Sequence, residues 1–166
     1  MNQPAKSRIE GGCDCGKLRY RLATEPMFVH CCHCSWCQRE SGSAFALNAL
    51  IETDRVELLE GEPVATELPT ASGKGQTVLR CSDCGVTLWS HFAGAGRAMA
   101  FVRIGTLEEP GRFPPDVHIF TSTRLPWVQL PEGVPVFEGY YAAKEVWPEA
   151  CQQRFRAMKQ AAQSGS

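Results

Sequence analysis

Hydrophobic residues occur in short runs along this chain, and glycine or proline separates most of the runs. Leu18, Tyr20 and Leu22 alternate with charged residues, which is the two-residue period of a strand with one buried face. Val56 and Leu58 repeat this spacing just before the turn-forming segment EGEP. No internal repeat, low-complexity tract or linker divides the 166 residues. The pattern therefore predicts one mainly β domain.

Further along the chain, three longer apolar runs predict further strands. They are QTVLRC (76–81), GVTLWSHF (85–92) and AMAFVRIGTL (98–107). The runs VHIFT (117–121) and VPVFEG (134–139) predict two shorter strands. The segment SGKGQT (72–77) lacks the full spacing of a phosphate-binding loop and no helix follows it, so we interpret it as a hairpin turn.

Near the C-terminus, the period of the apolar pattern changes from two residues to about 3.6 residues. Pro148 suits the first turn of a helix, and Cys151, Phe155, Met158 and Ala162 then recur with helical spacing. The fold class predicted is a mainly antiparallel β domain with a C-terminal α-helix. We expect residues 9–147 to form the β domain and 148–166 to form its helix with a frayed QSGS tail.

Composition and charge exclude several classes of function. Lys and Arg number 17 against 18 Asp and Glu, so a net charge of −1 provides no basic field for nucleic acid or an anionic membrane. No apolar run approaches the roughly 20 residues of a membrane span. The N-terminal MNQPAKSRIEGG lacks the apolar core of a secretion signal, which predicts a cytoplasmic protein with reduced thiols. Nine cysteines in such a chain favour metal binding over disulfides.

Two of the cysteine groups predict one shared structural zinc site. Each group ends in Cys-Gly, and the glycine can adopt the positive φ that a tight metal-binding turn requires. Together they supply the four thiolates of a closed tetrahedral site. These ligands are Cys13, Cys15, Cys81 and Cys84. The alternative is that one of the pairs consists merely of buried thiols.

The remaining cluster, VHCCHCSWCQRESGS, predicts a second zinc site with only three protein ligands. These are Cys32, Cys34 and Cys37, and three ligands leave an open position for water or substrate. Alternation along an extended chain turns Cys31 and His33 away from Cys32. It leaves His30 on the same side as Cys32, as the best candidate for an extra ligand. A closed structural site and an empty thiol cluster remain alternatives.

Three segments in this order resemble a known family: GGCDCGKLRY, CHCSWCQRESGSAF and LRCSDCGVTLW. With VRIGTLEEP and STRLPWVQLPEGVPVFEG, they are similar to the glutathione-dependent formaldehyde-activating enzyme (GFA) family, which includes centromere protein V-type domains. The resemblance covers roughly Ile9 to Gly139. It implies an Mss4-like fold of antiparallel sheets, and two zinc ions divided among the cysteines as above. Cys31 is a departure from the family motif.

The resemblance also implies an activity, in which glutathione and formaldehyde combine at the open zinc. That makes the chain a carbon–sulfur lyase-type enzyme, with Cys32, Cys34 and Cys37 as its catalytic zinc ligands. Glutathione is expected to need polar and aromatic partners. The candidates are Arg39, Ser43, Arg124 and Trp127, with His118 as a proton carrier. Each also has an ordinary explanation as a surface, turn or core residue.

Two other functions fit the same residues. One is a non-catalytic, zinc-stabilised module that binds glutathione, another thiol or a macromolecular partner. The basic extension that would contact nucleic acid in such a module is missing from this sequence. The other is zinc storage or redox sensing through Cys31. The residues themselves indicate thiol chemistry, and they do not identify the thiol or the aldehyde.

Overall fold

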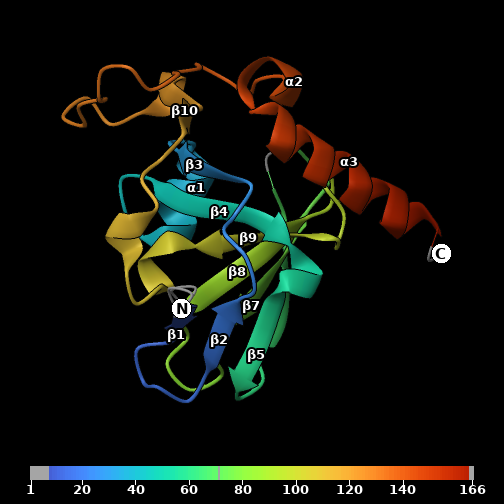
Figure 1. The fold of residues 1–166 in the computed structure, drawn as a ribbon. Helices are drawn as coiled ribbons and strands as arrows, with labels where there is room; N and C mark the ends of the chain where they lie inside the picture. The colour runs from blue at the N-terminus through green and yellow to red at the C-terminus, as the bar shows by residue number, and fades with distance from the viewer. Residues whose placement is uncertain (1–7, 71, 165–166) are drawn as a thin grey trace, which may run out of the picture.

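Two β-sheets and a C-terminal helix make up the computed structural model, which describes residues 8–70 and 72–164 (Figure 1). The larger sheet has the order β10 (Val117–Ile119), β3 (Phe28–Cys32), β4 (Ala46–Glu52), β9 (Met99–Arg103), β8 (Thr87–Phe92), β7 (Gln76–Arg80) and β6 (Val64–Leu68). The smaller sheet has the order β1 (Ile9–Gly12), β2 (Arg19–Leu22) and β5 (Val56–Glu60). The α-helices are α1 (Ser35–Ser41), α2 (Ala143–Val146) and α3 (Glu149–Ser164). Short 3₁₀ turns lie at Thr53–Arg55, Ile104–Thr106, Pro110–Arg112 and Thr121–Thr123.

Alternation along the central strands produces two apolar clusters, one on each face of the large sheet. The first joins Tyr20 of the small sheet to Ala49, Ile51 and Val102 of the large one. Leu50 and Phe101 point the other way and pack with the chain's C-terminal part, including Trp147 and Met158. The large sheet is therefore covered on both faces, by the small sheet on one and by the C-terminal segment on the other.

The strand pairing is antiparallel with one exception. Strand β10 runs parallel to β3, and the register pairs Val117 with His30, His118 with Cys31, and Ile119 with Cys32. Neighbouring residues in register project from the same face of a sheet. The exception therefore brings residues near position 118 beside the cysteine-rich strand, although about 87 positions separate them in sequence.

The predicted fold class is confirmed: the structure is mainly β, with a C-terminal helix. The strands predicted around Tyr20, Val56, 76–81, 85–92, 98–107 and 117–121 are all present, and β6 and β7 flank the predicted hairpin turn. A short helix, α1, directly follows Cys34. Strands β1, β3, β4 and β6 were not predicted.

One expectation about the C-terminal part is wrong. Segment 134–139 forms no strand: it makes one parallel bridge, between Val136 and His118, and its other backbone hydrogen bonds reach residues 120–122, beyond the end of β10. Helix α3 continues through Ser164 and so includes the first two residues of the tail that the sequence predicts to fray. The last two residues of that predicted tail, 165–166, lie outside the described part of the chain.

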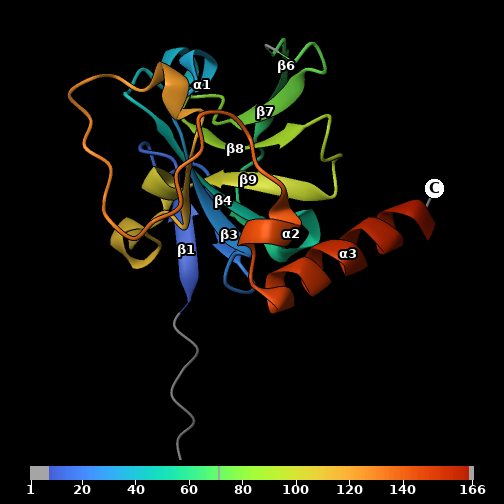
Figure 2. The same ribbon diagram turned by 90° about the horizontal axis from the view of Figure 1, so that it is seen from above.

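Helix α3 extends outward from the sheets, as both ribbon views show (Figures 1 and 2). Its inner end is anchored by Arg154, which donates to both carboxylate oxygens of Glu52 at 2.6 and 3.0 Å and to Thr24 Oγ1 at 3.2 Å. Met158 on the same helix is buried. Among the described residues, no helix has the length and apolarity needed to cross a bilayer.

Candidate functional site

Four thiols from distant parts of the chain meet between the two sheets. Cys13 and Cys15 follow β1, and Cys81 and Cys84 lie in the turn between β7 and β8. The four Sγ atoms all lie within 4.8 Å of one another, with Cys13–Cys15 at 3.4 Å and Cys15–Cys81 at 3.6 Å. Thiolates around a tetrahedral zinc ion lie roughly 3.8 Å apart, since each Zn–S bond is about 2.3 Å long. The group therefore fits a closed four-thiolate metal site.

Both halves of this group fold into the same kind of turn. Gly16 and Gly85 have φ of 77° and 74°, a region that L side chains rarely adopt. Their amides donate to the carbonyls of Cys13 and Cys81 at 3.2 and 3.0 Å. The amides of Cys15 and Val86 donate to the Cys84 sulfur and, with other contacts, lower its pKa to about 6. Such amide donation stabilises a thiolate, which is the form that binds a metal.

A second group joins the end of β3 to the start of α1. Cys32 is the last residue of the strand, Cys34 caps the helix, and Cys37 lies one turn into it. The three Sγ atoms lie within 4.8 Å of one another, and the Cys34 sulfur accepts from the Cys37 amide at 3.3 Å. Cys32 and Cys37 are buried, whereas Cys34 is partly exposed. Solvent therefore reaches this group through Cys34.

The hydrogen bonds within this second group concentrate negative charge on one sulfur. Hydrogen bonds from the Cys32 and Cys37 thiols hold the pKa of Cys34 far below its usual value, and backbone amides at the start of the helix add a smaller effect. The pKa of Cys32 is raised by hydrogen bonding with Cys34 and Cys37 and then by burial. Hydrogen bonding with Cys32 lowers the pKa of Cys37, but hydrogen bonding with Cys34 and burial outweigh it and raise the value to about 12. Three thiols sharing charge in this way suit a bound cation.

No fourth metal-binding side chain joins this group among residues 8–70 and 72–164. His30, the histidine expected to be closest to it, packs on the same face but bonds elsewhere. Its Nε2 lies 2.7 Å from the Tyr141 hydroxyl, which also accepts from the indole of Trp147 at 2.5 Å. The expectation that His30 is an extra ligand is therefore wrong, because an aromatic cluster occupies its ring nitrogen.

A buried ion-pair network holds the helix that carries Cys37. Glu40 of α1 accepts from Arg103 at 2.6 Å, from Arg80 at 3.0 Å and from Thr87 Oγ1 at 3.0 Å. Its side chain is only 4% exposed. Arg103 also bonds to Asn48 Oδ1, and its charge favours the thiolate of Cys37. The network ties α1 to three strands and places a cation beside the thiols.

Two tyrosines pack against His30, on the same face of β3 as Cys32. Tyr140 and Tyr141 stack with ring centroids 5.1 Å apart and planes 21° apart. Tyr140 remains 59% exposed. Partial desolvation raises the pKa of its hydroxyl, and negative charge on Cys32 adds to the rise. This face of β3 therefore carries an exposed aromatic ring as well as the three thiols.

A third group of ligand-type residues lies on the opposite face of β3. It consists of Cys31, His33 and His118, all buried. Burial lowers the pKa of both imidazoles, with that of His33 at about 4, so both rings are neutral near pH 7. The structure thus places His118 with Cys31 and His33, rather than facing Cys32 as a proton carrier for the thiol group would.

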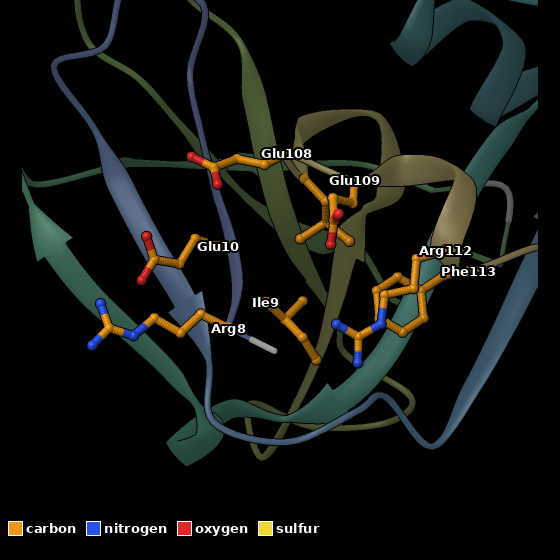
Figure 3. A pocket seen from close by; sticks show the side chains of 8 residues that line it. Arg8, Ile9, Glu10, Glu108, Glu109, Arg112 and Phe113 are labelled. Atoms are coloured by element: carbon orange, nitrogen blue, oxygen red, sulfur yellow. The ribbon is translucent and has the colours of Figure 1, made fainter. Parts of the chain in front are cut away.

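Neither of two hollows in the surface borders the thiol groups. One is a groove between Glu52 and α3, lined by Arg154, Met158 and alanines of the helix. The other is a shallow pocket where the start of β1 meets the turn that carries Arg112, and Figure 3 shows carboxylates and guanidinium groups around it. Its lining contains no cysteine or histidine. Neither hollow therefore contains a cysteine or histidine that could bind a metal.

Comparison with known proteins places this arrangement in a family. A family model described as "Glutathione-dependent formaldehyde-activating enzyme" matches residues 8–123, which include eight of the nine cysteines. The chain belongs to this family. The resemblance inferred from the sequence is thereby confirmed.

Two curated relatives of the GFA family both carry the name "Putative glutathione-dependent formaldehyde-activating enzyme". One, from Talaromyces marneffei, is 25% identical over 124 residues, and the match spans 74% of this chain and 65% of that protein. The other, from Halomonas elongata, is 25% identical over 128 residues, and the match spans 74% of this chain and 80% of that protein. The chain thus spans a little under two thirds of the first relative. A crystal structure of a Rhodobacter sphaeroides protein aligns with a TM-score of 0.44 and 16% identity, over 77% of this chain and 98% of that one.

The four residues predicted to contact substrate in this GFA-family chain lie in two places. Arg39 and Ser43 are exposed, on α1 and just after it. Arg124 is partly buried and donates to the Val128 carbonyl, while Trp127 is 70% exposed. Thr123 and Gln38 both donate to the His33 carbonyl, which brings the segment after β10 to the start of α1. Three of the four candidates are therefore open to solvent.

Sequence reasoning missed several residues around the thiols. Glu40, Arg103 and Tyr140 carry no spacing signal, because their contacts depend on strands and loops brought together by the fold. One signal was available for Arg103. It is the one charged residue within the run 98–107, and a charge in such a setting needs a buried partner. The aromatic run around Tyr140 offered a weaker signal.

Proposed function

We propose that this chain is a zinc-dependent carbon–sulfur lyase-type enzyme that forms or cleaves the adduct of a thiol and an aldehyde. Glutathione and formaldehyde are the proposed pair, as the family name suggests. The observation that carries the proposal is a group of three thiols without a fourth ligand among the described residues. Three protein ligands are typical of catalytic zinc, and four are typical of structural zinc. The proposal therefore assigns two zinc ions to the chain.

The donor set suits a soft ligand such as a thiol in the open position. Zinc held by Cys32, Cys34 and Cys37 would lower the pKa of a bound thiol and keep it nucleophilic near neutral pH. Addition of the sulfur to the aldehyde carbon forms the C–S bond. The proton lost from sulfur ends on the former carbonyl oxygen, and the reverse reaction breaks the same bond.

The chain's own residues would bind and orient the thiol. Arg103 offsets the negative charge that three thiolates create, since its guanidinium favours the Cys37 thiolate. Tyr140 presents an exposed ring on the same face of β3 as Cys32, against which a substrate's apolar atoms can pack. Arg39, Ser43, Arg124 and Trp127 are the proposed partners of the polar ends of glutathione. All nine cysteines are free thiols, as a reducing cytoplasm would keep them.

The proposal is tested by exchanging one thiol for a hydroxyl. Cys34→Ser should lose one zinc ion and the glutathione adduct in native mass spectrometry. It should also slow the exchange between formaldehyde and its glutathione adduct, read by NMR, by more than the roughly 100-fold typical of a metal site's outer partners. The control is Cys151→Ser, which alters a partly buried thiol outside the three groups.

Each outcome of this experiment decides between functions. Unchanged turnover in Cys34→Ser would contradict the lyase proposal. A glutathione adduct on the wild type without accelerated exchange would instead support the non-catalytic binding module. A gel shift with nucleic acid at physiological salt would contradict the proposed small-molecule partners.

A further inference from the structure

A buried cluster beside strands β3 and β10, at one edge of the large sheet, plays no part in the proposed thiol chemistry. His33 Nε2 lies 3.4 Å from Cys31 Sγ and 2.9 Å from His118 Nδ1. The two imidazoles are stacked, with centroids 5.2 Å apart and planes 25° apart. None of the three residues is more than 5% exposed. Three ligand-type side chains therefore converge at one point without solvent.

Strand geometry alone brings these residues together. Cys31 and His33 are two positions apart on an extended segment, so both face away from Cys32. His118 is the register partner of Cys31 on the parallel strand β10 and therefore projects from the same face. The cluster is thus built on two paired strands and on the residue directly after β3, His33, whose amide donates to the Ile119 carbonyl of β10 at 3.0 Å.

We propose that Cys31, His33 and His118 form a further metal site, which binds a late first-row transition metal ion such as Zn²⁺. One thiolate and two neutral imidazoles are the donors that Zn²⁺ and its neighbours in that series prefer. Sulfur and nitrogen donors on a tetrahedral zinc ion lie about 3.3–3.6 Å apart, given Zn–N bonds of about 2.0–2.1 Å and a Zn–S bond of about 2.3 Å. The observed separations are within a few tenths of an ångström of those values. Small side-chain shifts would therefore complete the site.

A hydrogen bond between the two rings does not by itself satisfy them. A neutral imidazole has one N–H and one lone pair. Whichever ring donates, the accepting ring keeps its own proton on its outer nitrogen. These outer nitrogens, His33 Nδ1 and His118 Nε2, are buried without a partner among the described residues. In the metal-bound form, the lone pairs of the two facing nitrogens and the Cys31 sulfur would bind the ion. Each outer nitrogen would then carry an N–H, which metal-bound histidines donate to a neighbour or a water.

The two states differ in where the ring protons lie. Without a metal, the shared hydrogen bond requires the same tautomer in both rings, either both Nε2–H or both Nδ1–H. With a metal on the facing nitrogens, His33 must be Nδ1–H and His118 must be Nε2–H. The ¹⁵N shifts of the imidazoles in zinc-loaded wild-type protein distinguish the two cases, and they require no substitution.

Counting the bound zinc provides the second measurement. After saturation with Zn²⁺ and removal of excess, native mass spectrometry should find one zinc ion more on the wild type than on Cys31→Ala or His118→Gln. His30→Gln is the matched control, because it alters a buried histidine on the opposite face of β3. Cys151→Ser is the control for loss of a thiol. Both controls should keep the wild-type count.

The outcomes separate this inference from the proposed function. Opposite tautomers, together with the loss of one zinc ion in both variants, would support the site. Identical tautomers in the two rings, or equal zinc counts in wild type and both variants, would overturn it. A substituted chain that fails to fold leaves the tautomer measurement on the wild type to decide. The lyase proposal would be unaffected, because its own test concerns Cys34.

Discussion

At the scale of single residues, the polar side chains beneath α1 depend on one another. Removing any one of them should lower the free energy of unfolding. Glu40 is the shared acceptor of Arg80, Arg103 and Thr87, and its carboxylate is almost fully buried. Removing one member of a buried pair leaves the other charge without compensation, which costs more than the pair itself contributes. The geometry of Cys37 therefore depends on a residue that contacts no substrate.

Glu40→Gln should consequently lower the free energy of unfolding by about 3 kcal/mol, because Arg103 loses its charged partner in a buried setting. Chemical denaturation of the zinc-loaded protein measures this loss. Glu149→Gln makes the same substitution in an exposed pair with Arg156 and should leave stability unchanged within error. Equal effects of the two substitutions would show that burial does not govern this network.

The grouping of seven of the thiols could be predicted from residue spacing. Cys13 with Cys15 and Cys81 with Cys84 are local pairs, so their turns and glycines are visible in the sequence. The relation of Cys31 to His118 could not be predicted, because it depends on a parallel pairing between segments far apart in the chain. The role of His30 was misjudged because Tyr141, 111 positions away, occupies its ring nitrogen.

At the scale of elements, α3 depends on a few anchoring contacts at its inner end. The helix projects from the sheets (Figure 2), and Arg154 joins it to Glu52 at the end of β4. Burial alone would raise the pKa of Glu52, but the hydrogen bonds and charge of Arg154 outweigh it and hold the pKa below its usual 4.5. The ionised carboxylate is therefore the form that keeps the helix docked.

The sign of the pH dependence follows from this lowered pKa. The stabilising contribution of Glu52 is fully present above about pH 4.5. It is lost as the pH falls through the lower pKa that Glu52 has in the folded protein. Amide hydrogen exchange in α3, corrected for intrinsic rates, should therefore accelerate relative to the sheet strands on acidification below that range. An α3 whose protection stays constant down to pH 3 would contradict this account.

Removing the cation should reproduce the acid effect at neutral pH. Arg154→Ala should raise amide exchange in α3 at pH 7 and abolish most of its further rise in acid, since the paired charge is gone. The expected loss in docking free energy is about 2 kcal/mol, because Arg55 still lies 3.4 Å from Glu52. Arg156→Ala, on the exposed pair of the same helix, is the control and should behave like the wild type.

Fold prediction at this scale succeeded where the sequence carries an alternating pattern, as in β2, or a long apolar run, as in β9. Strand β2 alternates in burial, and it was found from its pattern. Strand β3 is buried at all five positions and has no alternation to detect, so it was missed. Segment 134–139 was mistaken for a strand because it lies along the sheet edge, yet only Val136 pairs with β10 in strand geometry.

At the scale of the whole molecule, the four-thiolate group connects the two sheets through segments that lie far apart in the chain. It joins the start of the small sheet to the β7–β8 turn of the large sheet, across up to 71 positions. A metal bound there restrains both sheets at once, and its binding free energy adds to folding free energy. The three-thiolate group lies between β3 and the neighbouring α1, so its metal restrains only local structure.

The two groups should therefore differ in their effect on melting temperature. Cys81→Ser should lower the melting temperature of the zinc-loaded protein by more than about 8 °C, which for a chain of this size corresponds to several kcal/mol. Cys34→Ser should lower it by less than half as much. Differential scanning calorimetry measures both, and a larger effect from Cys34→Ser would reverse the assignment of the two groups.

Strand β3 presents different ligand sets on its two faces, with Cys32 on one and Cys31 and His33 on the other. A slip of one residue against β4 would exchange those faces, as it does in any strand with a two-residue period. The order of events during folding then matters, because metal that arrives before the sheet has formed can trap the wrong register. Refolding with zinc present from the start should accordingly be slower and less complete than refolding first and adding zinc afterwards. For this chain, a metal ion that would stabilise the finished fold would also favour misfolding if it bound too early.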